Sequence, residues 1–150
     1  MEHKYNTIML VHLEDKQFIS KFLTFFEDKG FNILHVPNIE QAYQTLGSQR
    51  IDIVVLDMDQ NYDSAYKFCY RVKRNENFKN IMLITLTAAN ERFNIFIDGR
   101  TKEERKWLNC DLLVHKPISA RNLYLLLKKE IAILEGIDAT ELDSESTSGA

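Results

Sequence analysis

The sequence predicts an α/β fold, a doubly wound five-stranded parallel sheet with helices on both faces. Five short apolar runs alternate along the chain with longer amphipathic stretches, which is the pattern of strands joined by crossover helices. Three runs, IMLVHL, IVVL and IMLITL, consist almost entirely of Val, Ile, Leu and Met. Strands covered by helices on both faces have this continuous apolar character, and right-handed crossovers limit how they can be connected.

Strands are expected at the apolar runs, because each run has the length of an ordinary strand and is bounded by polar residues. The predicted strands are Thr7–Leu13, Phe31–Val36, Ile51–Met58, Ile81–Ala88 and Asp111–His115.

Helices are expected where apolar residues recur at helical spacing between these runs. Phe18, Phe22, Phe25 and Phe26 mark the first helix, and Gly30 follows it as a stop signal. Asn38, three residues before Gln41, is a cap signal for the second. In the third, Ala65, Phe68 and Val72 are expected to face inward, and the last carries a leucine stripe that includes Leu126 and Leu134. The predicted helices are Lys16–Lys29, Asn38–Gln49, Asp63–Arg74 and Ser119–Leu134.

Composition places the chain among single-domain globular proteins. Of its 150 residues, 45% are hydrophobic and 11% aromatic, enough for a core. The net charge is −3, but residues 137–150 hold four acids and no base, and removing these charges leaves +1 for residues 1–136. We therefore expect a domain over residues 7–135 and a disordered, acidic, Ser/Thr-rich tail or linker over residues 136–150.

Several classes of function are disfavoured by the same data. A near-neutral body lacks the clustered Lys and Arg of a nucleic-acid surface, so no direct nucleic-acid partner is expected. No apolar run is long enough to span a membrane, and the N-terminal MEHKYNT lacks the apolar stretch of a signal peptide, so we expect a cytoplasmic protein. Cys69 and Cys110 are expected as buried, unpaired residues.

Reactive side chains gather where the predicted strands end. Glu14 and Asp15 follow the first strand, Asp57 ends the third, Thr87 the fourth, and Lys116 follows the fifth. The carboxyl ends of parallel strands lie at one edge of a sheet, where such folds bind ligands. Crowded carboxylates favour a hard cation such as Mg²⁺, and a carboxylate can attack phosphorus to form an aspartyl phosphate. A lysine and a hydroxyl would then stabilise the oxygens of the transferred group, and the central Asp57 is the best nucleophile.

These residues and their surroundings resemble the receiver domain of two-component response regulators. The likeness covers about residues 7–135 and rests on LED at 13–15, on the block Ile51–Ala88 and on LLVHKP at 112–117. The resemblance implies a flavodoxin-like fold with strand order 2-1-3-4-5. It implies a signalling domain rather than a metabolic enzyme. Such a domain catalyses only its own phosphorylation and dephosphorylation.

The resemblance also implies roles for single residues. Asp57 would be the phosphoacceptor, Thr87 the switch hydroxyl and Lys116 the phosphate-contacting base. Mg²⁺ would be held by Glu14, Asp15, Asp57 and the backbone carbonyl of Asp59. A cognate histidine kinase would donate the phosphoryl group, and the signal would leave through a downstream protein or a further domain of the same gene product.

Some positions depart from the family pattern. Asn61 and Ala65 replace a proline and a glycine of the loop beside the phosphoacceptor, and Leu113 replaces a switching aromatic. An insertion over Asn90–Asn109 falls on the usual output face. These departures keep an alternative open, a pseudo-receiver that binds partners without being regulated by phosphorylation. A phosphatase of the haloacid dehalogenase type, suggested by Asp57-Met58-Asp59, is disfavoured because the chain has no room for a cap domain.

Overall fold

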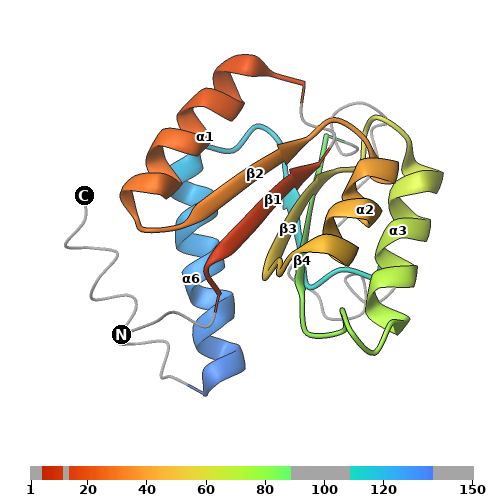
Figure 1. Cartoon of the computed structure of the whole chain (residues 1–150). Helices are drawn as coiled ribbons and strands as arrows, with labels where there is room; N and C mark the ends of the chain where they lie inside the picture. The colour runs from red at the N-terminus through yellow and green to blue at the C-terminus, as the bar shows by residue number, and fades with distance from the viewer. Residues whose placement is uncertain (1–4, 12–13, 89–108, 137–150) are drawn as a thin grey trace. The chain divides into compact units, whose positions relative to one another are not determined.

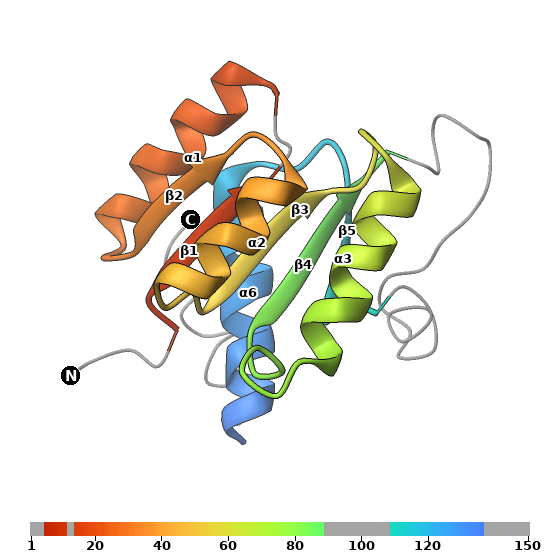
Figure 2. The same cartoon turned by 45° about the vertical axis from the view of Figure 1, so that its right-hand side comes forward.

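The computed structural model describes residues 5–11, 14–88 and 109–136, and it has the predicted sheet. The strands are parallel and lie in the order β2-β1-β3-β4-β5, as expected (Figures 1 and 2). The predicted fold class and strand order are thus confirmed. The strands are β1 (Thr7–Val11), β2 (Asn32–Val36), β3 (Ile53–Asp57), β4 (Met82–Thr87) and β5 (Leu112–His115).

The described helices start and end close to the predicted positions. Asn38 caps α2, as its spacing to Gln41 predicted, and Ser119 caps α6. A left-handed Gly136, with φ of 75°, ends α6. The helices are α1 (Lys16–Asp28), α2 (Ile39–Ser48), α3 (Tyr62–Arg74) and α6 (Ala120–Glu135).

The chain divides into two compact units, residues 1–117 and 118–150. The first contains the whole described sheet and α1 to α3, and the second contains α6. In the second unit, Leu123 and Leu127 of the predicted stripe are buried, whereas Leu126 and Leu134 are exposed. Leu134 differs from expectation because it lies in the last helical turn, one residue before the helix ends.

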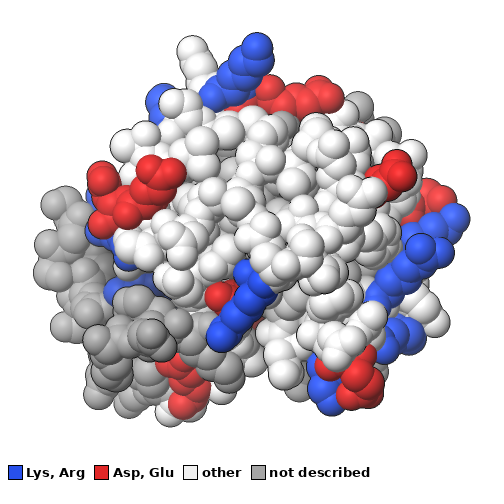
Figure 3. All heavy atoms as spheres, in the orientation of Figure 1, with Lys and Arg blue, Asp and Glu red and all other residues white. Residues whose placement is uncertain are grey.

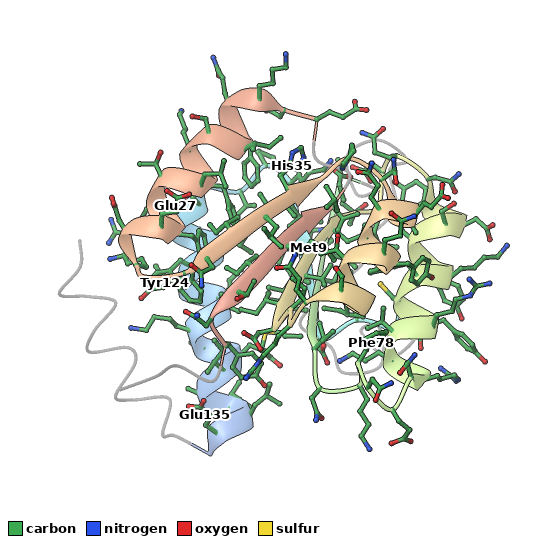
Figure 4. The ribbon with its side chains drawn as sticks, in the orientation of Figure 1. Met9, Glu27, His35, Phe78, Tyr124 and Glu135 are labelled. Carbon is green, nitrogen blue, oxygen red and sulfur yellow. The ribbon has the colours of Figure 1, made fainter. Side chains whose placement is uncertain are left out.

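Within the first unit, helices cover both faces of the sheet. Met9 and Leu56 share one buried cluster with Leu46 of α2 and Phe68 of α3, so these two helices pack on the same face. Helix α1 lies on the other side of the sheet (Figures 1 and 2). In Figure 4, Met9 lies in the middle of the sheet and Glu27 on the outer side of α1. Every residue of β3 and β4 is buried, which accounts for their largely apolar sequences, IVVLD and MLITLT.

Two carboxylates fasten strands at the amino-terminal edge of the sheet. The Asp52 carboxylate accepts hydrogen bonds from the backbone N–H groups of Asn6 and Thr7, at 2.9 and 3.0 Å. The Asp111 carboxylate accepts one from the N–H of Leu83 at 2.7 Å and lies 2.6 Å from the Lys73 ammonium. These acids pair backbone donors that a strand end would otherwise leave unsatisfied, so we assign them structural roles.

The face of the molecule drawn in Figure 3 carries charges of both signs. Figure 3 shows Lys and Arg interspersed with Asp and Glu on the face in view. In the part of the chain that the structure describes, no helix combines the length and the apolar character needed to cross a membrane. Most of the Asn90–Asn109 insertion and residues 137–150 of the predicted tail lie outside the described residues.

Candidate functional site

Asp57 occupies the position that the sequence predicted, at the carboxyl end of the central strand. β3 lies between β1 and β4, and the N–H of Met58 still donates to the carbonyl of Leu86 at 2.9 Å. The side chain of Asp57 is 7% exposed. Its Oδ1 accepts a hydrogen bond from the backbone N–H of Asp59 at 2.8 Å, and its Oδ2 lies 2.8 Å from Nζ of Lys116. The carboxylate is therefore buried, and each of its two oxygens has a hydrogen-bond donor.

Lys116 reaches this edge from the end of β5. Its backbone N–H donates to the carbonyl of Thr87 at 2.8 Å, which continues the pairing of β4 with β5. The ammonium bridges two carboxylates, at 2.8 Å from Asp57 Oδ2 and 2.7 Å from Asp59 Oδ2. Burial alone would lower the pKa of Lys116, but the hydrogen bonds and charges of Asp57 and Asp59 outweigh it and raise the pKa. The lysine is thus held in its charged form.

The side chain of Asp59 lies inside the site. Its Oδ1 accepts hydrogen bonds from the hydroxyls of Tyr62, at 2.7 Å, and Thr87, at 2.9 Å. Its Oδ2 accepts one from the backbone N–H of Ala88, at 2.9 Å, and contacts the Lys116 ammonium. Four donors, from α3, the end of β4, the residue after β4 and the residue after β5, therefore converge on one carboxylate that is 6% exposed.

This arrangement strongly favours the ionised form of Asp59. Burial acts to raise the pKa, but hydrogen bonds from Lys116, Tyr62, Ala88 and Thr87 overcome it and lower the pKa to about 2. The ammonium contacts both acids, which offsets the repulsion between them.

Glu14 and Asp15 lie at the start of α1. Asp15 is the N-cap of that helix, and its Oδ1 accepts hydrogen bonds from the N–H groups of Gln17, at 3.0 Å, and Phe18, at 3.1 Å. Glu14 is exposed. In the described ranges, no three acidic, histidine or cysteine side chains are grouped closely enough to hold a metal ion. The donors that the sequence assigned to Mg²⁺ are nevertheless all oxygen atoms, which suit this hard ion.

The structure thus brings Asp57, Thr87 and Lys116 together with Asp59, and it places Glu14 and Asp15 at a helix cap. Sequence reasoning assigned only the backbone carbonyl of Asp59 to the site, so its side chain was missed. The available signal was the acid itself, two residues beyond the predicted nucleophile at the same edge of the sheet.

Two further residues of the site were also missed. Tyr62, the first residue of α3, gave no signal apart from its position after the strand-end loop. Ala88 contributes through its backbone N–H and gave none. Asn61, interpreted from the sequence only as a lost proline, caps α3 by accepting a hydrogen bond from the N–H of Ser64 at 3.0 Å. This cap positions Tyr62 beside the site.

Comparison with known proteins identifies the fold. No family model matches the chain. The chain is 29% identical over 102 residues to the phosphate regulon transcriptional regulatory protein PhoB of Pseudomonas aeruginosa, an alignment that covers 68% of this chain and 42% of that protein. The chain therefore spans less than half the length of this curated relative.

The similarity to solved structures extends over more of this chain and over nearly all of each matched chain. A response regulator of Thermotoga maritima has a TM-score of 0.65 at 22% identity, covering 85% of this chain and 98% of that one. The chemotaxis response regulator CheY4 of Vibrio cholerae has a TM-score of 0.67 at 15% identity, with coverages of 85% and 99%. The receiver domain of a signal transduction histidine kinase from Syntrophus aciditrophicus has 0.67 at 21%, with 89% and 95%. The chain has the receiver-domain fold of response regulators.

Proposed function

We propose that this chain is the phosphoacceptor receiver domain of a two-component response regulator and that it acts in the cytoplasm. A histidine kinase would supply the phosphoryl group to Asp57. The signal would leave by contact with a downstream protein or with a further domain of the same gene product. The observation that supports this function best is the contact of Lys116 Nζ with Asp57 Oδ2 at 2.8 Å, beside the Thr87 hydroxyl and the Ala88 N–H.

In the proposed reaction, a carboxylate oxygen of Asp57 attacks phosphorus. A new P–O bond forms while the bond from phosphorus to the donor breaks, and the donor leaves with that electron pair. The Lys116 ammonium is placed to neutralise charge on the phosphoryl oxygens, and the Thr87 hydroxyl to donate a hydrogen bond to them. Both groups lie within hydrogen-bonding distance of an anion in this structure, the carboxylate of Asp59.

The proposal includes a Mg²⁺ ion at the same edge. Glu14, Asp15, Asp57 and the backbone carbonyl of Asp59 would hold it, and the ion would supply positive charge beside the transferred phosphoryl group. Asp15 is engaged at the cap of α1, so its carboxylate would have to serve both the helix and the metal or leave the cap.

The test is phosphorylation by acetyl phosphate in the presence of Mg²⁺, followed by intact mass spectrometry. We expect a mass gain of one phosphoryl group that Asp57→Asn abolishes and that excess EDTA prevents. Asp63→Asn is the matched control, because Asp63 is an exposed acid of α3 paired with Lys67. An unmodified native chain, or an equal gain in Asp57→Asn, would refute the proposal.

One observation favours a second candidate, a pseudo-receiver that binds partners without being regulated by phosphorylation. The groups proposed to contact the phosphoryl group already contact the chain's own Asp59. A module of this kind would show no change in stability or in tryptophan fluorescence when Mg²⁺ and beryllium fluoride are added. Saturable changes that require Asp57 would exclude it.

A further inference from the structure

The Asp59 carboxylate lies among the donors that an oxyanion at this site would need. Its two oxygens accept hydrogen bonds from the Thr87 hydroxyl and the Ala88 N–H, both at 2.9 Å, and Oδ2 lies 2.7 Å from Lys116 Nζ. An ammonium, a hydroxyl and a backbone N–H converging on two oxygens form an anion-binding site. In this chain a side chain of the protein fills that site.

The filled site adjoins the predicted nucleophile. Lys116 Nζ contacts Asp57 Oδ2 and Asp59 Oδ2 at once, and the backbone N–H of Asp59 donates to Asp57 Oδ1. A phosphoryl group bonded to Asp57 would extend toward the same lysine, hydroxyl and N–H. It would also bring a charge of about −2 next to the ionised Asp59. The carboxylate and the phosphoryl group therefore compete for the same donors.

Tyr62 strengthens the hold on the carboxylate. Its hydroxyl, at the start of α3 and only three residues after Asp59 in the sequence, donates to Asp59 Oδ1 at 2.7 Å. With this bond, both oxygens of Asp59 have two donors each, and the side chain is 6% exposed. Withdrawal of the carboxylate would break four polar contacts, so it is a firmly held occupant rather than a loosely placed surface acid.

We propose that Asp59 is a built-in occupant of the anion site, which an incoming oxyanion at Asp57 must displace, and that it holds Thr87 and Lys116 in an anion-bound arrangement without phosphorylation. The inference rests on the proposed function only in taking Asp57 as the point of attachment. It makes Asp59 the residue that sets how readily the site accepts a phosphoryl group.

The experiment compares the native chain with Asp59→Asn, Asp59→Ala and Asp63→Asn. The first variant removes the charge and keeps the shape, and the second also opens space. Asp63→Asn makes the same change at an exposed acid of the same loop-and-helix region. Far-UV circular dichroism and a cooperative thermal transition select folded variants. The probe is beryllium fluoride with Mg²⁺, titrated while the amide resonances of Ala88 and Asp59 are followed by NMR.

We expect half-saturation at a concentration at least tenfold lower in Asp59→Ala than in the native chain, with Asp59→Asn between them and Asp63→Asn equal to native. The Ala88 amide should shift in both Asp59 variants before the probe is added, because it loses its carboxylate acceptor. Equal half-saturation in all four proteins would overturn the inference, as would a failure of every variant to bind the probe.

Acetyl phosphate labelling separates this inference from the proposed function. Labelling of the native chain on Asp57 at the same rate as of Asp59→Ala would leave the phosphoacceptor function intact and remove the role of Asp59. Labelling of Asp59→Ala alone would support the built-in occupant and would show that the native chain is the pseudo-receiver.

Discussion

Lys116 is the single described cation that contacts both buried carboxylates, so its removal should be costly. Its Nζ lies 2.8 Å from Asp57 and 2.7 Å from Asp59, whose side chains are only 7% and 6% exposed. Lys116→Met keeps the apolar stem and deletes the charge. Removing one partner of a buried ion pair costs about 3–5 kcal/mol, and because Lys116 is itself 29% exposed we expect the lower end, about 3 kcal/mol.

The assay is urea denaturation followed by far-UV circular dichroism, near neutral pH and near pH 4. The loss in the free energy of unfolding should shrink at the lower pH, because carboxylates that have lost their cation protonate more readily. Adding Asp59→Asn to Lys116→Met should recover about 1 kcal/mol or more, since it removes one of the two uncompensated charges.

Lys67→Met is the control, because Lys67 pairs with Asp63 on the surface, where the two side chains are 65% and 74% exposed. That substitution should change stability by no more than about 0.5 kcal/mol. A loss below about 1 kcal/mol for Lys116→Met, or a loss that is the same at both pH values, would refute the assignment of Lys116 as the charge that holds the two acids together.

Three further predictions concern single groups. The pKa of Asp59 is lowered from its ordinary 3.8 to about 2, so the contribution of Asp59 to folding stability is present above about pH 4 and is lost as the pH falls toward 2. Asp59→Asn should therefore flatten the decline in Tm over this pH interval. An unchanged decline would contradict the hydrogen-bond network around Asp59. Thr85 is fully buried, and its hydroxyl has no hydrogen-bond partner among the described residues. Thr85→Val should therefore raise the free energy of unfolding, measured in urea, by about 1 kcal/mol. A lower free energy of unfolding in this variant would indicate an acceptor for the hydroxyl. Burial raises the pKa of the Cys69 thiol, so the native protein should resist alkylation of Cys69 by iodoacetamide near pH 8. The free energy of unfolding should fall above about pH 9, because only the thiol of the unfolded chain ionises there. Rapid labelling of Cys69 in the native protein, measured on a peptide map, would contradict this.

The fold was predictable because its determinants are local. The runs at 51–58 and 81–88 are mostly apolar, and the strands inside them, β3 and β4, are buried at every residue. Asn38 indicates the start of α2 through a cap that involves only neighbouring residues. Signals of this kind are encoded within a few residues, so the sequence alone places them.

The side-chain arrangement of the site depends on longer-range contacts. Thr87 and Ala88 lie 28 and 29 residues beyond Asp59, and Lys116 lies further still along the chain. The strand order brings these residues to one edge of the sheet, as the sequence predicted. The path of the loop after β3 decides which of these residues Asp59 contacts. Asn61 sets that path by capping α3. From the sequence, Asn61 was interpreted only as the loss of a proline, and its role as a cap was therefore missed.

The central position of β3 has a consequence for which parts of the site can move. Its backbone is hydrogen-bonded on both sides, to β1 and to β4, and every residue is buried, so amide protons such as that of Leu56 should exchange with solvent only through global unfolding. The N–H of Asp59 instead donates to the side chain of Asp57, and the N–H of Ala88 donates to the side chain of Asp59. Rotation of either side chain releases one of these N–H groups without breaking the sheet. Hydrogen exchange should therefore separate the slow backbone of β3, which carries Asp57, from local openings at the N–H groups of Asp59 and Ala88 that need no global unfolding. A signal that starts at this edge of the sheet would travel through these local openings.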